Sequence, residues 1–99
     1  MILKPGVKIA NLKPQLLIAI IIADNVYSAH KQELVITSVD DSKHGSTTLH
    51  GSGNAFDCRT SYFTKAEQMT VHSEIKNKCG DNFDVILELD HIHIEHDPR

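Results

Sequence analysis

The chain has 99 residues, which is the size of a single domain with one modest hydrophobic core. Its formal net charge is −3 and its basic residues are scattered, so the composition does not indicate a nucleic-acid partner. Two cysteines, Cys58 and Cys79, are too few for a disulfide scaffold and lack the Cys-x-x-Cys spacing of a thiolate zinc site. Such sparse use of cysteine is typical of a reducing compartment.

The first part of the chain predicts an irregular entry segment, one apolar helix and a short strand. Residues 1–11 contain a Lys-Pro-Gly turn signal at residues 4–6. A helix is predicted from Pro14, whose missing N–H is tolerated in a first turn, to about His30. Its apolar residues point in nearly every direction, which indicates deep burial or packing against more than one element. Residues 34–37 are typical of a short buried strand.

A strongly apolar run at residues 16–23 falls within this predicted helix. The run is far shorter than the roughly 20 residues that a membrane span needs. It is similar to the apolar part of a signal peptide, but its removal would delete the main hydrophobic helix of a small domain. We therefore expect neither stable membrane insertion nor an export signal.

A polar loop over residues 38–48 leads into the second part of the chain. A strand is then predicted at residues 54–58, in which Asp57 points away from its packed neighbours. Residues 64–67 form a capping box, which predicts the start of a helix. This helix is expected to end near Cys79, because the glycine that follows it is a natural C-terminal cap.

The chain ends in two predicted strands, at residues 83–88 and 91–95, joined at residues 89–90 by a tight hairpin or a bulge. Strict alternation in the last strand places His91, His93 and Glu95 on one face and two isoleucines on the other. The order helix, strand, strand, helix, strand, strand predicts an α+β fold. We expect a small, largely antiparallel sheet covered by two helices.

Seven histidines are many for a chain of this length, and most of them lie in two segments. These segments contain His44, His50, His91, His93 and His96. A single histidine is most often solvated or packed in a core, and this is our interpretation of His30 and His72. The clustering of the other five beside acidic residues favours a shared site.

His50 and Asp57 lie seven residues apart and are candidate metal ligands. Gly51 and Gly53 between them would let the backbone approach a metal closely. His93, from the polar face of the last strand, would complete a set of two imidazoles and one carboxylate. Such a set is typical of catalytic zinc with an open position, at roughly 2.0–2.2 Å to each ligand. Manganese and non-haem iron use similar ligands, so the set alone leaves the metal open.

Hydrolysis at such a metal needs a base that takes a proton from water. Asp90 lies three residues before His93 and Glu88 lies five residues before it. His91 shares the face of His93 and could orient or protonate a reaction intermediate. The spacing therefore predicts metal-assisted hydrolysis, with these three residues as candidate catalytic groups. The competing hypothesis is a metal-free α+β domain with solvated histidines.

Two short motifs allow a comparison with known families. His50, Gly53, Ala55 and Asp57 match the pattern H-x-x-G-x-A-x-D, and Thr48 precedes it at a position where Ser or Thr is common. This pattern resembles the signature of zinc D-Ala-D-Ala carboxypeptidases and L-alanyl-D-glutamate endopeptidases. Hedgehog signalling domains share the fold of that family.

The second motif is Asp90-x-x-His93, which resembles the family's D/E-x-x-H motif. The His-Ile-His at residues 91–93 is similar to that of Hedgehog-like members. The resemblance extends to small phage and prophage peptidases and covers nearly the whole chain, from about Leu3 to Pro98. The two motifs in this order make the resemblance specific.

The resemblance implies one Hedgehog/DD-peptidase-like domain over residues 1–99. It implies a zinc ion held by His50, Asp57 and His93, with Asp90 as general base. The implied substrate is a peptide bond in the stem peptides of bacterial peptidoglycan. His44 would lie near the mouth of the site, where it could bind substrate.

One departure from the family concerns the anchor for a substrate carboxylate. Larger members carry an arginine before the metal loop, whereas residues 38–41 contain none. Lys43 and Arg59 are candidates to replace it, and Arg59, His44 and Thr48 are the predicted substrate-binding residues. The missing arginine favours an endopeptidase over a carboxypeptidase.

The resemblance also leaves an alternative without turnover. Hedgehog-like relatives keep the fold and zinc while serving recognition, so a zinc-containing module that binds the cell wall or builds a phage particle is the alternative hypothesis. For either function we expect the protein in the cytoplasm of a bacterial host before its release to the wall, because no export signal is convincing.

Overall fold

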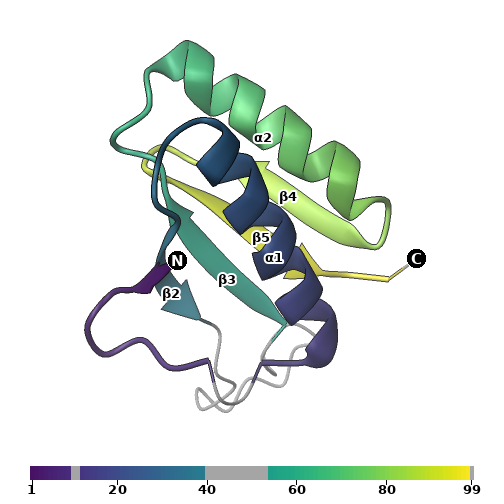
Figure 1. Ribbon diagram of the computed structural model, residues 1–99. Helices are drawn as coiled ribbons and strands as arrows, with labels where there is room; N and C mark the ends of the chain where they lie inside the picture. Colours follow the sequence, from purple (N-terminus) through teal and green to yellow (C-terminus); the bar gives the residue numbers. More distant parts are fainter. Residues whose placement is uncertain (10–11, 40–53, 99) are drawn as a thin grey trace.

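The computed structural model describes residues 1–9, 12–39 and 54–98 (Figure 1). The elements in chain order are β1 (Ile2–Leu3), α1 (Pro14–Ala29), β2 (Val35–Val39), β3 (Ala55–Arg59), α2 (Lys65–Cys79), β4 (Phe83–Leu87) and β5 (His91–His96). The strands form a 5-stranded sheet in the order β1-β2-β3-β5-β4. Strand β1 is parallel to β2, and the other neighbours are antiparallel. The predicted α+β class, a largely antiparallel sheet with two helices, is confirmed.

Local signals in the sequence determine where the helices begin and end. Helix α1 starts at Pro14, as predicted. Helix α2 is capped by Thr64, whose Oγ1 accepts the Glu67 N–H at 3.1 Å while Glu67 Oε1 accepts the Thr64 N–H at 2.8 Å. Gly80 follows α2 with φ of 81°, a left-handed conformation that favours glycine. The predicted capping box and helix end are therefore confirmed.

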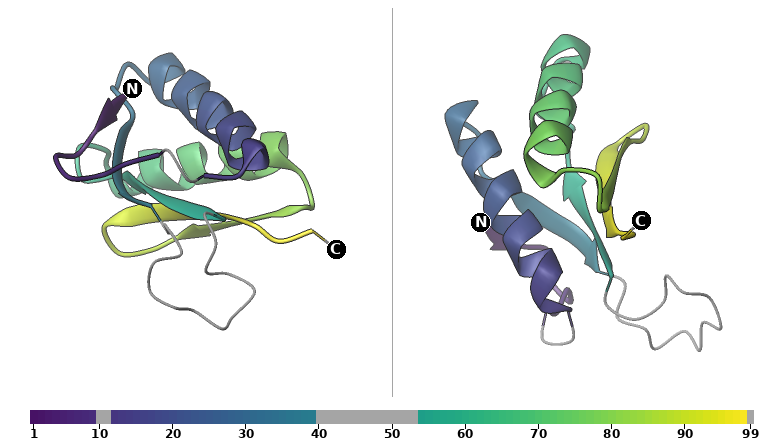
Figure 2. Two further views of the ribbon diagram at one scale, coloured as in Figure 1. Left: turned by 90° about the horizontal axis from the view of Figure 1, so that it is seen from below. Right: turned by 90° about the vertical axis from the view of Figure 1, so that its right-hand side faces the viewer.

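Both helices pack on the same face of the sheet (Figure 2). Alternate residues of the central strands meet them, and Phe56, Ile92 and Ile94 are at most 1% exposed. Because side chains of a strand alternate between faces, the residues between these ones lie on the opposite face. This polar face, as we name it, carries Asp57, Arg59, His91, His93 and Glu95.

The first strand was not predicted, because its two residues are too short a pattern to recognise. The Ile2 N–H donates to the Leu34 carbonyl at 2.7 Å, and the Lys4 N–H donates to that of Ile36 at 2.9 Å. The entry segment is thus tied to the sheet rather than irregular throughout. The predicted turn after it is present, with Gly6 at φ of 90°.

The structure corrects one predicted boundary and decides between two alternatives for the first helix. Strand β2 continues through Ser38 to Val39, with an irregular register between Ile36 and Ser38, so the predicted loop begins too early. Helix α1 packs against both α2 and the sheet, which confirms the second of the two predicted alternatives, and it is not deeply buried on every side, since Ile18 and Ile21 are 60% and 61% exposed. Among the described residues, no helix is both long enough and apolar enough to cross a membrane.

The last two strands form a tight hairpin, which decides between the two predicted connections. The Glu88 N–H donates to the His91 carbonyl at 2.8 Å and closes the turn over residues 89–90. Strand β5 then runs between β3 and β4. This central position brings its histidines next to β3.

Candidate metal centre

The sheet register places Asp57 of β3 directly opposite His93 of β5. Both side chains lie on the polar face, away from the helices, and both are partly buried. The two residues are 36 positions apart in the chain. Antiparallel pairing of β3 with β5 therefore brings together two of the three predicted metal ligands.

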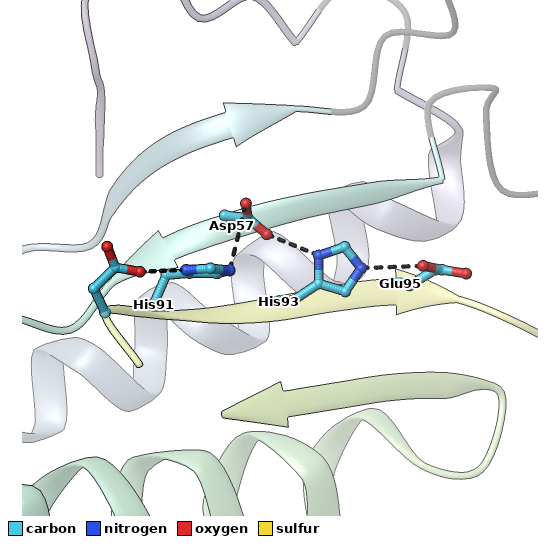
Figure 3. Close-up of polar contacts among 5 residues, drawn as sticks. Asp57, His91, His93 and Glu95 are labelled. Atoms are coloured by element: carbon cyan, nitrogen blue, oxygen red, sulfur yellow. Dashed lines mark hydrogen bonds and ion pairs between the residues drawn. The ribbon is translucent and has the colours of Figure 1, made fainter. Parts of the chain in front are cut away.

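The imidazole of His93 is held between two carboxylates (Figure 3). Its Nδ1 donates to Asp57 Oδ1 at 2.8 Å, and its Nε2 donates to Glu95 Oε1 at 3.0 Å. Donation from both nitrogens requires the protonated ring. The hydrogen bond to Asp57, with that to Glu95, outweighs partial burial and raises the pKa of His93 to about 9. Without metal, this ring is an imidazolium at neutral pH.

Asp90 and His91 form a second pair beside the first. His91 Nδ1 donates to Asp90 Oδ1 at 2.7 Å, and this bond lowers the pKa of the exposed Asp90 carboxyl. On the other side of the ring, His91 Nε2 lies 3.7 Å from Asp57 Oδ2. Figure 3 shows His91, Asp57, His93 and Glu95 in a row along the face. With Asp90, the hydrogen-bond partner of His91, these residues form what we name the polar row.

The chemistry of this row fits part of a zinc site. The Asp57 oxygen and the His93 nitrogen are donors that zinc prefers, and they point at each other. A proton occupies the place between them in the metal-free protein, and a zinc ion would compete for the same lone pairs. Glu95 accepts a hydrogen bond from the far ring nitrogen, as carboxylates commonly do with metal-ligating histidines, so Nδ1 would be the atom available to a metal.

The third predicted ligand, His50, lies outside the described residues, as do His44 and Thr48. Within residues 1–9, 12–39 and 54–98, no group of three or more His, Cys, Asp and Glu side chains could hold a metal ion. The described part of the chain therefore offers two candidate donors and a carboxylate that orients one of them. A zinc site built on them would need a third ligand from outside the described residues.

The other two predicted site residues in the described part of the chain, Glu88 and Arg59, lie in different hollows. Glu88 lines a hollow with Lys65, Gln68 and Met69 of α2, and no described contact joins it to Asp57 or His93. Arg59 lies opposite His91 in the register and lines a hollow that also includes Asp90 and His91. The structure thus groups Arg59 and Asp90 with the polar row and separates Glu88 from it.

The histidines that we interpreted as structural have such roles. His72 Nε2 lies 2.7 Å from the Val85 carbonyl and links α2 to β4. His30 Nε2 lies 2.8 Å from Glu74 Oε1 and links the two helices. Neither residue belongs to the polar row.

Sequence reasoning missed two residues near the site. Glu95 was recognised as sharing a face with His93, but not as its partner, although their spacing of two in a strand was the available signal. Lys4 lines a hollow together with Asp90 and His91. The sequence did not indicate this position, because β1 was not predicted.

Comparisons with models of protein families, with curated proteins and with solved structures found no match for the chain. The resemblance to zinc peptidases therefore depends on the motifs and stays a prediction.

Proposed function

We propose that this chain is a zinc peptidase that hydrolyses a peptide bond in peptidoglycan stem peptides, with a Hedgehog/DD-peptidase-like fold. One observation carries the proposal: Asp57 and His93 meet at 2.8 Å on the polar face, with Glu95 on the far nitrogen of the imidazole. These are the residues that both motifs predict as ligands. His50 is the proposed third ligand.

A bound zinc ion would supply the Lewis acidity that polarises a peptide carbonyl and acidifies water. The residues of the chain must first make room for it. His93 gives up its Nδ1 proton, while Glu95 keeps its hydrogen bond to Nε2 and so fixes the orientation of the ring. We therefore expect zinc binding to release a proton at neutral pH.

Asp90 and His91 are the proposed base of the reaction. The hydrogen bond from His91 Nδ1 to Asp90 fixes the imidazole ring of His91. Its Nε2 then faces Asp57, one of the two proposed ligands. His91 Nε2 would then accept a proton from water, and the Asp90 carboxylate would stabilise the imidazolium that forms. The same contact keeps Asp90 ionised, since it lowers the pKa of its carboxyl. Asp90, the base predicted from the sequence, thus acts together with its neighbour.

Among the described residues, the arrangement of layers leaves an approach for substrate over the polar face. Both helices pack on the opposite face of the sheet, so they do not obstruct the polar row (Figure 2). A stem peptide bound over the polar face would contact the proposed ligands, Asp57 and His93, and the proposed base next to them. An endopeptidase remains favoured over a carboxypeptidase because residues 38–41 lack the family's arginine.

The experiment is digestion of defined muropeptides by zinc-loaded protein, with new amino termini identified by mass spectrometry. We expect cleavage at one type of stem-peptide bond. Asp90→Ala should keep stoichiometric zinc and lose turnover by about 10²–10⁴-fold, because His91 then lacks the carboxylate that orients its ring and stabilises its imidazolium. Glu88→Ala is the matched control, because both acids belong to the same hairpin, and it should cleave like the parent protein.

Three outcomes would contradict the proposal in different ways. Full turnover by Asp90→Ala, with loss in Glu88→Ala, would transfer the base function to Glu88. Tight zinc and wall binding without any new amino termini would favour the module that only binds the wall. Absence of stoichiometric zinc, with a melting temperature that zinc does not change, would leave a metal-free domain.

A further inference from the structure

Helix α1 carries apolar side chains that the fold of one chain leaves uncovered. Its inner side packs on α2 and on the sheet. On its outer side, Leu17, Ile18 and Ile21 are 44%, 60% and 61% exposed. Residues three and four apart are neighbours on a helix surface, so these three side chains form one group. A contiguous apolar group of this kind indicates an interaction surface, whereas isolated exposed apolar residues do not.

The outer side of α1 also has the spacing of a coiled-coil seam. Exposed residues recur at alternating intervals of four and three along what we name the outer stripe: Pro14, Ile18, Ile21, Asn25 and Ser28. This heptad spacing keeps one line of side chains facing a partner helix. A single asparagine within such a seam is a common means of fixing register and the number of helices. The outer stripe is therefore suited to pack against one further helix.

The charges on α1 make the outer stripe complementary to itself. Lys13 precedes the helix, Asp24 lies in its second half, and no charged residue stands between them. At 3.6 residues per turn, both lie on the same flank of the outer stripe. If Ile18 packs against Ile21 of an antiparallel second copy, Lys13 comes within about two residues, or ~3 Å along the axis, of the position facing Asp24 of that copy. Opposite charges then meet at both ends of the helix pair.

Both charged groups are accessible for such a contact. Lys13 is exposed. Asp24 Oδ1 lies 3.5 Å from the amino group of Met1, and the Asp24 side chain remains 39% exposed. The same amino group is also paired with Glu33, so the Asp24 carboxylate has room for a second cation.

We propose that the outer stripe of α1 is the contact surface of a homodimer, in which the two copies of α1 pack antiparallel about a two-fold axis. The two-fold axis lets the same surface serve both copies, so the ion pair between Lys13 and Asp24 forms twice. The polar row lies on the opposite face of the sheet and stays open in both copies (Figure 2). The inference concerns another surface than the proposed peptidase site and holds whether or not the chain cleaves peptides.

Sedimentation equilibrium of the full chain measures the dimer directly. The mass should rise with concentration from the 11.0 kDa of one chain toward twice that value. Two short helix faces bury less surface than a standard protein interface, so we expect a dissociation constant of about micromolar or weaker, and the series must extend above ~100 µM. A mass of one chain over the whole series would overturn the proposal.

Substitution of the apolar residues tests whether α1 forms the interface. Ile18→Gln and Ile21→Gln should each weaken the dimer by about tenfold or more, because each places an amide in the centre of the contact. Ile86→Gln is the matched control, since Ile86 is 46% exposed on the polar face, and it should dimerise like the parent protein. Far-ultraviolet circular dichroism and melting temperature check the fold of each variant. A dimer unchanged in both α1 variants would overturn the proposal.

Charge reversal tests the antiparallel arrangement. Lys13→Glu and Asp24→Lys each bring like charges together at two places and should each weaken the homodimer by about tenfold. An equimolar mixture of the two variants should regain the parent affinity, because opposite charges again meet at both places. Lys78→Glu, which reverses an exposed lysine of α2, is the control and should leave the dimer unchanged.

This recovery on mixing distinguishes a contact between copies from a change in the fold of either variant. Failure of the mixture to recover would overturn the antiparallel pairing. Binding to phosphatidylcholine–phosphatidylglycerol vesicles by a chain that stays monomeric, with loss of that binding in Ile18→Gln, would assign the outer stripe to a lipid surface and overturn the homodimer.

Discussion

The two faces of the central strands are built for different purposes. On the helix side, Phe56, Ile92 and Ile94 are almost completely excluded from solvent. On the polar face, Asp57 and His93 stand between these positions and keep 22% and 29% of their side chains exposed. Adjacent residues of one strand therefore belong to different environments.

This difference suggests that the helix side of the sheet provides most of the stability of the domain, whereas the polar face is available for chemistry. Burial of apolar side chains is the main source of folding free energy. Partly exposed ion pairs contribute little to it, because water competes for them and their side chains must be ordered. The polar row is thus free to serve binding at small cost to the fold, and substitutions on the two faces should separate the two effects.

The largest effect is expected at Asp57, on metal binding. Asp57→Ala removes one proposed ligand and the partner of His93, so stoichiometric zinc should be lost. The free energy of unfolding of the metal-free protein should fall by about 1.5–3 kcal/mol, the usual value of a hydrogen bond to a charged group. Elemental analysis and urea unfolding measure the two quantities. Retained zinc would show that Asp57 is not a ligand.

The neighbouring residue Phe56 should show the opposite behaviour. Phe56→Ala opens a cavity in the core and is expected to lower the free energy of unfolding by ~3–5 kcal/mol. Ile86→Ala is the control, because Ile86 lies opposite His93 and is 46% exposed, and it should cost far less. Urea unfolding compares the two variants. A similar loss in both would contradict the assignment of the core to the helix side.

A smaller effect is expected at Glu95. Glu95→Gln replaces the carboxylate on His93 Nε2 with a neutral amide, so the ring is held less firmly and its ligating nitrogen is less basic. Loss of such a partner typically weakens metal affinity 10–100-fold. Zinc competition with a chromophoric chelator measures this change. An unchanged zinc affinity would show that Glu95 does not support metal binding and contacts His93 only in the metal-free protein.

The sequence predicted those parts of the fold that depend on local physics. The capping box at Thr64 determines the start of α2, and strict alternation in β5 places His91 and His93 on one face. The pairing of β3 with β5 could not be predicted in this way, since it depends on packing between residues that are far apart in the chain. The contacts of His93 with Asp57 and Glu95 follow only from that pairing.

Lys4, which lines a hollow beside Asp90 and His91, shows the same limit. A strand as short as β1 has no recognisable period, and only its hydrogen bonds to β2 bring Lys4 near Arg59 and Asp90. Asp57 and His93, the two proposed ligands, were singled out in the sequence because each belongs to one of the two motifs. The residues around them were missed because their roles arise from the tertiary structure.

The smallest effect is a dependence of stability on pH in the metal-free protein. The pKa of His93 is about 9 in the folded state, above its ordinary value of 6.5. The folded state therefore holds this proton more tightly, and the stabilisation is complete below pH 6.5 and is lost as pH rises through 9. The difference in free energy of unfolding between the parent protein and His93→Gln should decrease over that range. Bound zinc should abolish the decrease, because it replaces the proton on Nδ1, and a constant difference in the metal-free protein would contradict the raised pKa.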